Sequence, residues 1–222
     1  MQKILITSPS LHTSDNVSGI ANLTRLVIYN NKDINYHHLI TGKKDHESRN
    51  YVWFIKQLLL PIKFFLRLVN NHDIKICHIN VPQEDFAIIR EGVLILIAKF
   101  MRRKIIVHFR GGKYNMRKIE KAFIRIAFKS ILTLSHKIIS LSEIEKKYLV
   151  QYYNIDDFKI AVLPNAVRVS DGLSYKDYDG ILKIIFLGRI EKDKGLDEII
   201  NTLKNLYTVS YTHLTLPTKR IV

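Results

Sequence analysis

The chain alternates short apolar runs with longer segments of helical periodicity, and this alternation restricts the fold more than any other feature. The apolar runs predict strands at 3–7, 36–41, 74–80, 104–109, 137–140 and 159–163. Between them, the spacing of apolar residues predicts helices at 19–29, 53–69, 86–100, 115–132 and 143–152. Strands that alternate with helices favour a parallel sheet with crossover helices. The predicted fold is therefore α/β, with a Rossmann-like, doubly wound parallel sheet.

A second, shorter unit is expected after this sheet. Residues 168–182 are polar and contain two glycines, which is typical of a linker, so the first domain is predicted to span 1–167. Ile184–Leu187 predicts a buried strand and 196–206 an amphipathic helix, so 183–208 indicates the first β-α unit of another Rossmann-like domain. We interpret 209–222, which is rich in threonine, as a non-native read-through tail. A genuine short strand and tail is the alternative.

Composition indicates a globular protein of a reducing compartment. The sequence is 47% hydrophobic and 25% charged, and its one cysteine, Cys77, excludes an internal disulfide framework and is predicted to lie in the core. No signal peptide is visible, and Arg90-Glu91 interrupts the longest apolar segment, 86–100, which is too short to span a bilayer. We therefore expect a cytoplasmic location, with peripheral contact at the cytoplasmic face of the membrane left open.

The net charge of +15 is distributed unevenly. Residues 95–150 contain 14 Lys or Arg against three Glu, or 14 − 3 = +11. Such a segment favours a polyanionic partner: an anionic leaflet, a nucleic acid or a phosphorylated substrate. On the predicted helix 115–132, with Phe123 and Phe128, we expect a membrane or acceptor patch; an ordinary solvated helix face is the alternative. The expected patch cations are Arg117, Lys118, Lys121 and Arg125, and the expected apolar face is Ile119, Phe123, Ile126 and Ser130.

Two groups of residues are candidates for binding phosphate or assisting a reaction. Arg189 and Lys194 flank a predicted strand–loop–helix turn, where the helix N-terminus adds amide donors for a diphosphate; a solvated turn is the alternative. Arg110 ends an apolar strand and needs an anion or water. His108 lies two residues earlier on the same strand face, where a core histidine is the alternative.

Several motifs, taken in order, resemble the GT-B glycosyltransferases of the large retaining family typified by bacterial polysaccharide and lipopolysaccharide transferases. They are Ser18-Gly19-Ile20, Asp73 to Ile79, Val107 to Gly112, Ile138 to Glu143, Leu163 to Val167, and Gly188-Arg189 with Lys194-Gly195. The resemblance implies two Rossmann-like domains across a cleft, with the acceptor on the N-terminal side and the nucleotide sugar mostly on the other. The residues with implied roles are Ser18, Gly19, Arg189 and Lys194 at the donor diphosphate, His108 and Arg110 at the reacting sugar, and Gly111, Gly112 and Asn165 at the cleft.

The resemblance also implies a reaction. A sugar would pass with retention from a nucleotide-diphosphate sugar to a lipid-linked or polysaccharide acceptor, without a metal or other cofactor. The chain departs from the family pattern because no two glutamates have the E-x7-E spacing, and 209–222 is unlike the family. We therefore interpret the sequence as truncated within its C-terminal domain and expect it to have little or no activity as it stands.

A nucleic-acid-binding protein is the competing hypothesis for the basic segment. It predicts aromatic residues interleaved with cations on one exposed face and a steep salt dependence of binding. The aromatic residues of 95–150 fall mostly at core-spaced positions, which disfavours this alternative. Binding to duplex and single-stranded DNA at two salt concentrations distinguishes the two hypotheses.

Overall fold

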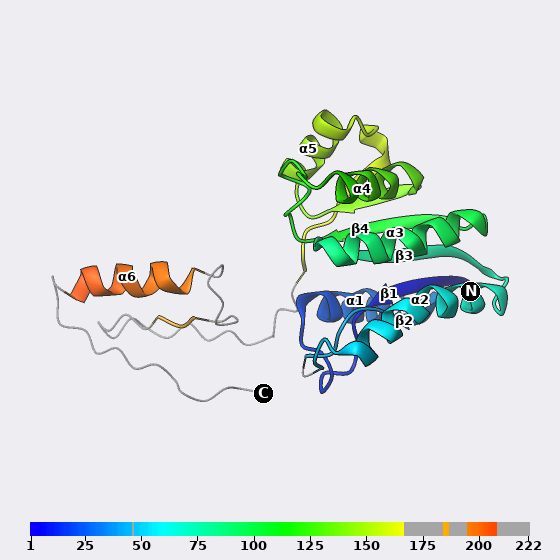
Figure 1. Ribbon diagram of the computed structural model, residues 1–222, viewed down its shortest axis with the longest axis horizontal. Helices are drawn as coiled ribbons and strands as arrows, with labels where there is room; N and C mark the ends of the chain where they lie inside the picture. Colours follow the sequence, from blue (N-terminus) through cyan, green and yellow to red (C-terminus); the bar gives the residue numbers. More distant parts are fainter. Residues whose placement is uncertain (46, 167–183, 187–194, 208–222) are drawn as a thin grey trace. The chain divides into compact units, whose positions relative to one another are not determined.

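The strands of the first unit, Met1–Val169, pair into one parallel sheet (Figure 1). The computed structural model describes residues 1–45, 47–166, 184–186 and 195–207. Within them, six strands take the order β2-β1-β3-β4-β5-β6. The strands are β1 Gln2–Ser8, β2 Ile34–Ile40, β3 Ile74–Pro82, β4 Lys104–Arg110, β5 Lys137–Ser140 and β6 Ile160–Val162. The predicted Rossmann-like, all-parallel α/β architecture is confirmed.

Helices connect successive strands and cover the sheet. They are α1 Gly19–Asn30, α2 Tyr51–Val69, α3 Asp85–Phe100, α4 Ala122–Leu134 and α5 Glu143–Tyr153, with a short 3-10 helix at Asp157–Lys159. The strand order reverses at β1, so right-handed crossovers place α1 on one face and α2 to α5 on the other. The main core joins α2, α3, α4 and α5 to the sheet, and α2 lies beside α3 in Figure 1.

The core lies between the sheet and these four helices. Phe64, Phe109 and Phe128 are among its largest fully buried side chains, and the rings of Phe109 and Phe128 lie 5.2 Å apart. Burying one such side chain contributes roughly 1.5–3 kcal/mol. Cys77 is buried in the same core, as predicted, and burial raises the pKa of its thiol to about 12.

The helix predicted at 115–132 begins at Ala122, and the prediction for 115–121 is wrong. The side-chain oxygen of Gln83 accepts hydrogen bonds from the backbone N–H groups of Tyr114 and Asn115, so this segment follows a tertiary contact rather than a helical ladder. The predicted apolar face is wrong within the helix, although Ile119, which precedes the helix, is buried in the core. Ile124, Phe128 and Ile131 are buried in the core, whereas Phe123 and Ile126 are exposed.

The second unit, Ser170–Val222, contains one described helix, α6 Leu196–Tyr207. Asp197 and Glu198 occupy its first turn, where negative charge is favourable. The strand predicted from Ile184 is not formed over 184–186, and Ile184 and Ile185 are exposed. The backbone N–H and C=O groups of a strand need a neighbouring strand as hydrogen-bond partner. The described residues of this unit contain no strand that could pair with 184–186. The predicted linker and tail lie outside the described residues.

Candidate active site

The carboxyl ends of β1, β3 and β4 gather polar side chains at the point where the strand order reverses. In open parallel α/β sheets, ligands bind outside the carboxyl ends of the strands at such a switch point. Here the switch lies between β1 and β3, and β4 is the next strand. The candidate active site is therefore built from the last residues of these strands and the loops that follow them.

Asn80, near the end of β3, is the centre of a buried hydrogen-bond network. Its side-chain nitrogen donates to the carbonyl of Thr7 at 2.6 Å and to the hydroxyl of Thr24 at 3.4 Å. Its side-chain oxygen accepts from Nε of Arg110 at 2.8 Å. Three elements, β1, α1 and β3, thus fix the position of one guanidinium at the end of β4.

Arg110 is a buried cation without a buried counter-ion in the described part of the chain. The residue is 8% exposed, and burial lowers the pKa of its guanidinium to about 10, so the group remains charged at neutral pH. Among the described residues, no carboxylate forms an ion pair with it, and its guanidinium donates a hydrogen bond to the neutral side chain of Asn80. Burying a charge is costly unless it is paired, so this arrangement favours an anionic ligand.

His108 lies beneath Arg110 on the same face of the sheet and stacks on His78. The two rings are 5.6 Å apart and inclined by 9°. His108 is 2% exposed, and burial lowers its pKa to about 2 and that of His78 to about 4; neither ring accepts or donates a hydrogen bond at Nε2 among the described residues. Both rings are therefore neutral at physiological pH and are weak bases. The burial agrees with a core histidine, and a catalytic role of His108 stays a prediction.

Ser18 and Gly19 begin α1 at the same edge of the sheet. The hydroxyl of Ser18 accepts a hydrogen bond from the N–H of Ala21 at 3.4 Å and caps the helix. Asn16, just before it, donates to the carbonyl of Lys43 at 3.2 Å, which ties this loop to the one after β2. A Cβ at Gly19 would meet no atom within 4 Å, so packing within the chain does not require glycine there. Its role toward a phosphate stays a prediction.

The loop after β4 is shaped by its two glycines. Gly111 has a φ of +99°, which favours glycine, and a Cβ at Gly112 would lie 3.1 Å from Oε1 of Glu145. The buried carboxylate of Glu145 accepts from the N–H of Leu141 at 2.8 Å and from the side chain of Asn115 at 3.3 Å. These bonds hold the loop beside the end of β4, next to Arg110.

Sequence reasoning missed Asn80, Thr24, Gln83 and Glu145, which position this site. A weak signal was present, since Asn80 is a polar residue inside the apolar run of β3. Its importance depends on the pairing of β3 with β4, which sets it beside the end of β4, near Arg110. No sequence spacing specifies that neighbour.

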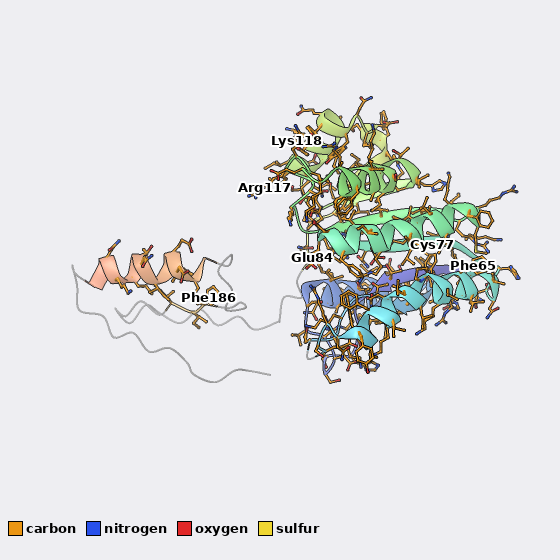
Figure 2. The ribbon with its side chains drawn as sticks, viewed as in Figure 1. Phe65, Cys77, Glu84, Arg117, Lys118 and Phe186 are labelled. Carbon is orange, nitrogen blue, oxygen red and sulfur yellow. The ribbon has the colours of Figure 1, made fainter. Side chains whose placement is uncertain are left out.

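The predicted basic patch is only partly assembled. Arg117 and Lys118 are exposed in the loop before α4 and lie close together in Figure 2. Lys121 pairs with Asp85, and Arg125 donates to the carbonyl of Ile119 at 3.2 Å, so both have partners within the chain. A surface pocket of about 220 Å³ lies here. Its lining residues are Asp85, Lys113, Tyr114, Arg117, Lys118, Ile119, Glu120 and Lys121.

The remaining predicted site residues do not join this cluster in the described structure. Asn165 is exposed after β6, and Arg189 and Lys194 lie outside the described residues. No group of three or more His, Cys, Asp or Glu side chains within 1–45, 47–166, 184–186 and 195–207 is arranged to hold a metal ion. None of the helices in these ranges is both long and apolar enough to cross a membrane.

The fold and the site define a Rossmann-like α/β domain whose switch point presents a buried, uncompensated cation. Comparison with known families gives the class a name. The family model of Glycosyltransferase Family 4 matches residues 27–171. The chain therefore belongs to that family, and the matched region is a GT-B-like glycosyltransferase domain. No curated protein matches the chain.

Proposed function

We propose that the protein transfers a sugar, with retention of anomeric configuration, from a nucleotide-diphosphate sugar to a lipid-linked or polysaccharide acceptor. The observation that carries the proposal is Arg110, a buried cation held by Asn80 at the switch point of a Glycosyltransferase Family 4 domain. In this reaction, the anion that would bind Arg110 is the diphosphate of the nucleotide-sugar donor. The acceptor class suggests a role in making cell-surface polysaccharide or lipopolysaccharide.

In the proposed reaction, charge develops on the leaving diphosphate as its bond to the sugar breaks. A preorganised guanidinium stabilises that charge without moving, because Asn80 already fixes it. The acceptor hydroxyl oxygen forms the new bond to the anomeric carbon on the face that the diphosphate leaves, and the departing diphosphate takes the hydroxyl's proton. This step requires no carboxylate of the enzyme as nucleophile or base. We propose that Arg189 and Lys194 bind the same diphosphate and that neither a metal nor another cofactor takes part.

Binding of nucleoside diphosphates tests this proposal without requiring turnover. We expect calorimetry with the full 222-residue chain to detect at least one of UDP, GDP and ADP. Arg110→Met is expected to weaken that binding by about 10- to 100-fold, since hydrogen bonds to charged groups contribute roughly 1.5–3 kcal/mol. Arg117→Met, which removes an exposed cation, is the matched control and leaves the affinity unchanged. Equal affinity of the Arg110→Met variant and the wild type would contradict the proposal.

Nucleic-acid binding remains the competing prediction for the basic segment. Phe109 and Phe128 are fully buried and cannot stack on bases, whereas Phe100 and Phe123 are exposed. Binding to duplex and single-stranded DNA that falls steeply with salt, and does not depend on Arg110, would favour this alternative.

A further inference from the structure

The outer surface of α2 and α3 is apolar, although both helices already bury another face in the core. Leu58 of α2 is 76% exposed and Phe100 of α3 is 82% exposed. Phe65, labelled in Figure 2, lies on this surface of α2. We call it the α2–α3 surface. It consists of Tyr51, Val52, Phe54, Ile55, Leu58, Leu59, Ile62, Phe65 and Leu66 of α2, and Phe86, Ile89, Val93, Leu96 and Phe100 of α3.

The spacing of these residues forms a stripe along each helix. On α3 they recur at intervals of three and four residues from Phe86 to Phe100, and on α2 the same intervals connect Tyr51 to Phe65. The stripes are distinct from the buried ones, which contain Leu60 and Phe64 on α2 and Ile95 on α3. A helix at the surface of a soluble domain normally presents polar residues outward. Large exposed apolar patches mark interaction sites.

The two stripes belong to one continuous surface. The helices pack side by side, and the rings of Phe54 and Phe86 lie 6.2 Å apart across their interface. Trp53, beneath them, is 5.4 Å from Phe86 and is buried. Aromatic residues thus join α2 to α3 at one end, while Phe65 and Phe100 extend the surface toward the other.

The exposed charges on these two helices are all positive. They are Lys56, Lys63 and Arg67 on α2 and Lys99 on α3, and exposed Arg102 and Lys104 follow the end of α3. Glu84, exposed just before α3, pairs with Arg49 at 3.6 Å. Glu47 pairs with Lys56 at 3.0 Å, which leaves the other five without an ion pair among the described residues. The acidic residues of α3 do not offset them, because Glu91 is buried against Arg90 and Asp85 is bound to Lys121.

We propose that the α2–α3 surface docks on an anionic phospholipid bilayer. Exposed Phe and Leu side chains flanked by Lys and Arg are the pattern of helices that lie in the plane of the membrane interface. Each cation near an anionic leaflet contributes about 1 kcal/mol. A second copy of the chain fits less well, because a two-fold interface would bring the cations of both surfaces together. The docking does not depend on sugar transfer, so it is tested independently of the proposed function.

Vesicle flotation with the full chain tests this inference. Vesicles of phosphatidylcholine with added phosphatidylglycerol are expected to bind the protein, and pure phosphatidylcholine vesicles to bind it much more weakly. Leu58→Ser with Ile62→Ser is expected to reduce binding roughly tenfold or more, since two large apolar side chains no longer enter the interface. Lys63→Gln with Arg67→Gln is expected to reduce binding about 30-fold at low salt and to have less effect at high salt.

Matched controls separate this surface from the rest of the molecule. Ile144→Ser with Phe158→Ser removes exposed apolar side chains elsewhere and is expected to leave binding unchanged. Circular dichroism and thermal unfolding confirm that each variant is folded. Loss of binding in Arg117→Gln with Lys118→Gln, but not in the α2 variants, would overturn the inference in favour of the basic loop. Absence of binding to anionic vesicles would also overturn it, as would a dimer that Leu58→Ser with Ile62→Ser converts to a monomer.

Discussion

Arg90 and Arg110 are equally buried, at 9% and 8% exposed, yet their surroundings differ in one decisive respect. Arg90 lies 2.6 Å from the carboxylate of Glu91 and donates to Gln57 at 3.2 Å. Arg110 donates to a neutral amide and has no carboxylate partner among the described residues. The first cation is neutralised within the fold and needs nothing more. The second is held in place but not neutralised, which is what a site for an external anion requires.

The comparison predicts that the two arginines contribute differently to stability, and this is the largest effect we expect. Arg90→Met leaves the buried carboxylate of Glu91 unpaired and should cost about 3–5 kcal/mol of unfolding free energy. Arg110→Met leaves the amide oxygen of Asn80 unsatisfied but also removes an unpaired buried charge, so it should cost no more than roughly 1–2 kcal/mol. Urea unfolding of both variants measures the difference.

A double variant provides the control. Burial raises the pKa of Glu91, and the charge of Arg90 opposes that rise. Replacing both residues by neutral ones therefore leaves no unpaired charge in the buried site. Arg90→Met with Glu91→Gln should therefore recover most of the stability lost in Arg90→Met alone. Equal losses in Arg90→Met and Arg110→Met would mean that the two sites do not differ in the way proposed.

The surroundings of Arg110 also predict acid sensitivity. His78 and His108 have lower pKa values in the folded chain, about 4 and about 2, than the ordinary value of 6.5. The unfolded chain binds more protons below pH 6.5, so stability falls as the pH drops from 6.5 toward 4 for His78 and toward 2 for His108. Below pH 6.5, each histidine should lower the free energy of unfolding by about 1.4 kcal/mol per pH unit, which is about 2 kcal/mol at pH 5.

Replacing one of these histidines measures how much it contributes to the loss of stability at low pH. His108→Phe keeps an aromatic ring in the buried position and removes one titrating group. Urea unfolding at about pH 7 and about pH 5 should show that this variant loses about 2 kcal/mol less than the wild type. His12→Phe, at an exposed position, is the control. An unchanged pH dependence in His108→Phe would show that His108 is not held neutral by burial.

The difference between the two arginines also shows what sequence can and cannot predict. The sequence indicates Arg110 as a candidate because a cation at the end of an apolar strand is unusual. The helices and strands up to β6 follow from local periodicity, with one exception at α4. This helix starts later than predicted because the backbone N–H groups of Tyr114 and Asn115 donate to the side chain of Gln83. Arg90-Glu91 indicated only an interruption of an apolar segment. Their mutual pairing, like the bond between Asn80 and Arg110, depends on packing between distant or buried groups that periodicity does not encode.

Asn80→Asp gives the most direct test, because it turns the environment of Arg110 into one like that of Arg90. One oxygen of the new carboxylate would lie where the amide oxygen now accepts from Nε at 2.8 Å, and it would neutralise the guanidinium within the fold. The hydrogen bond that the amide nitrogen donates to the carbonyl of Thr7 is lost in this variant and in Asn80→Ser alike. Binding of a nucleoside diphosphate should then weaken by about tenfold or more, since each tenfold corresponds to about 1.4 kcal/mol. Asn80→Ser, which adds no charge, should weaken binding less, and calorimetry compares the two. If both variants weakened binding to the same extent relative to the wild type, positioning by Asn80 would matter but the charge balance at Arg110 would not.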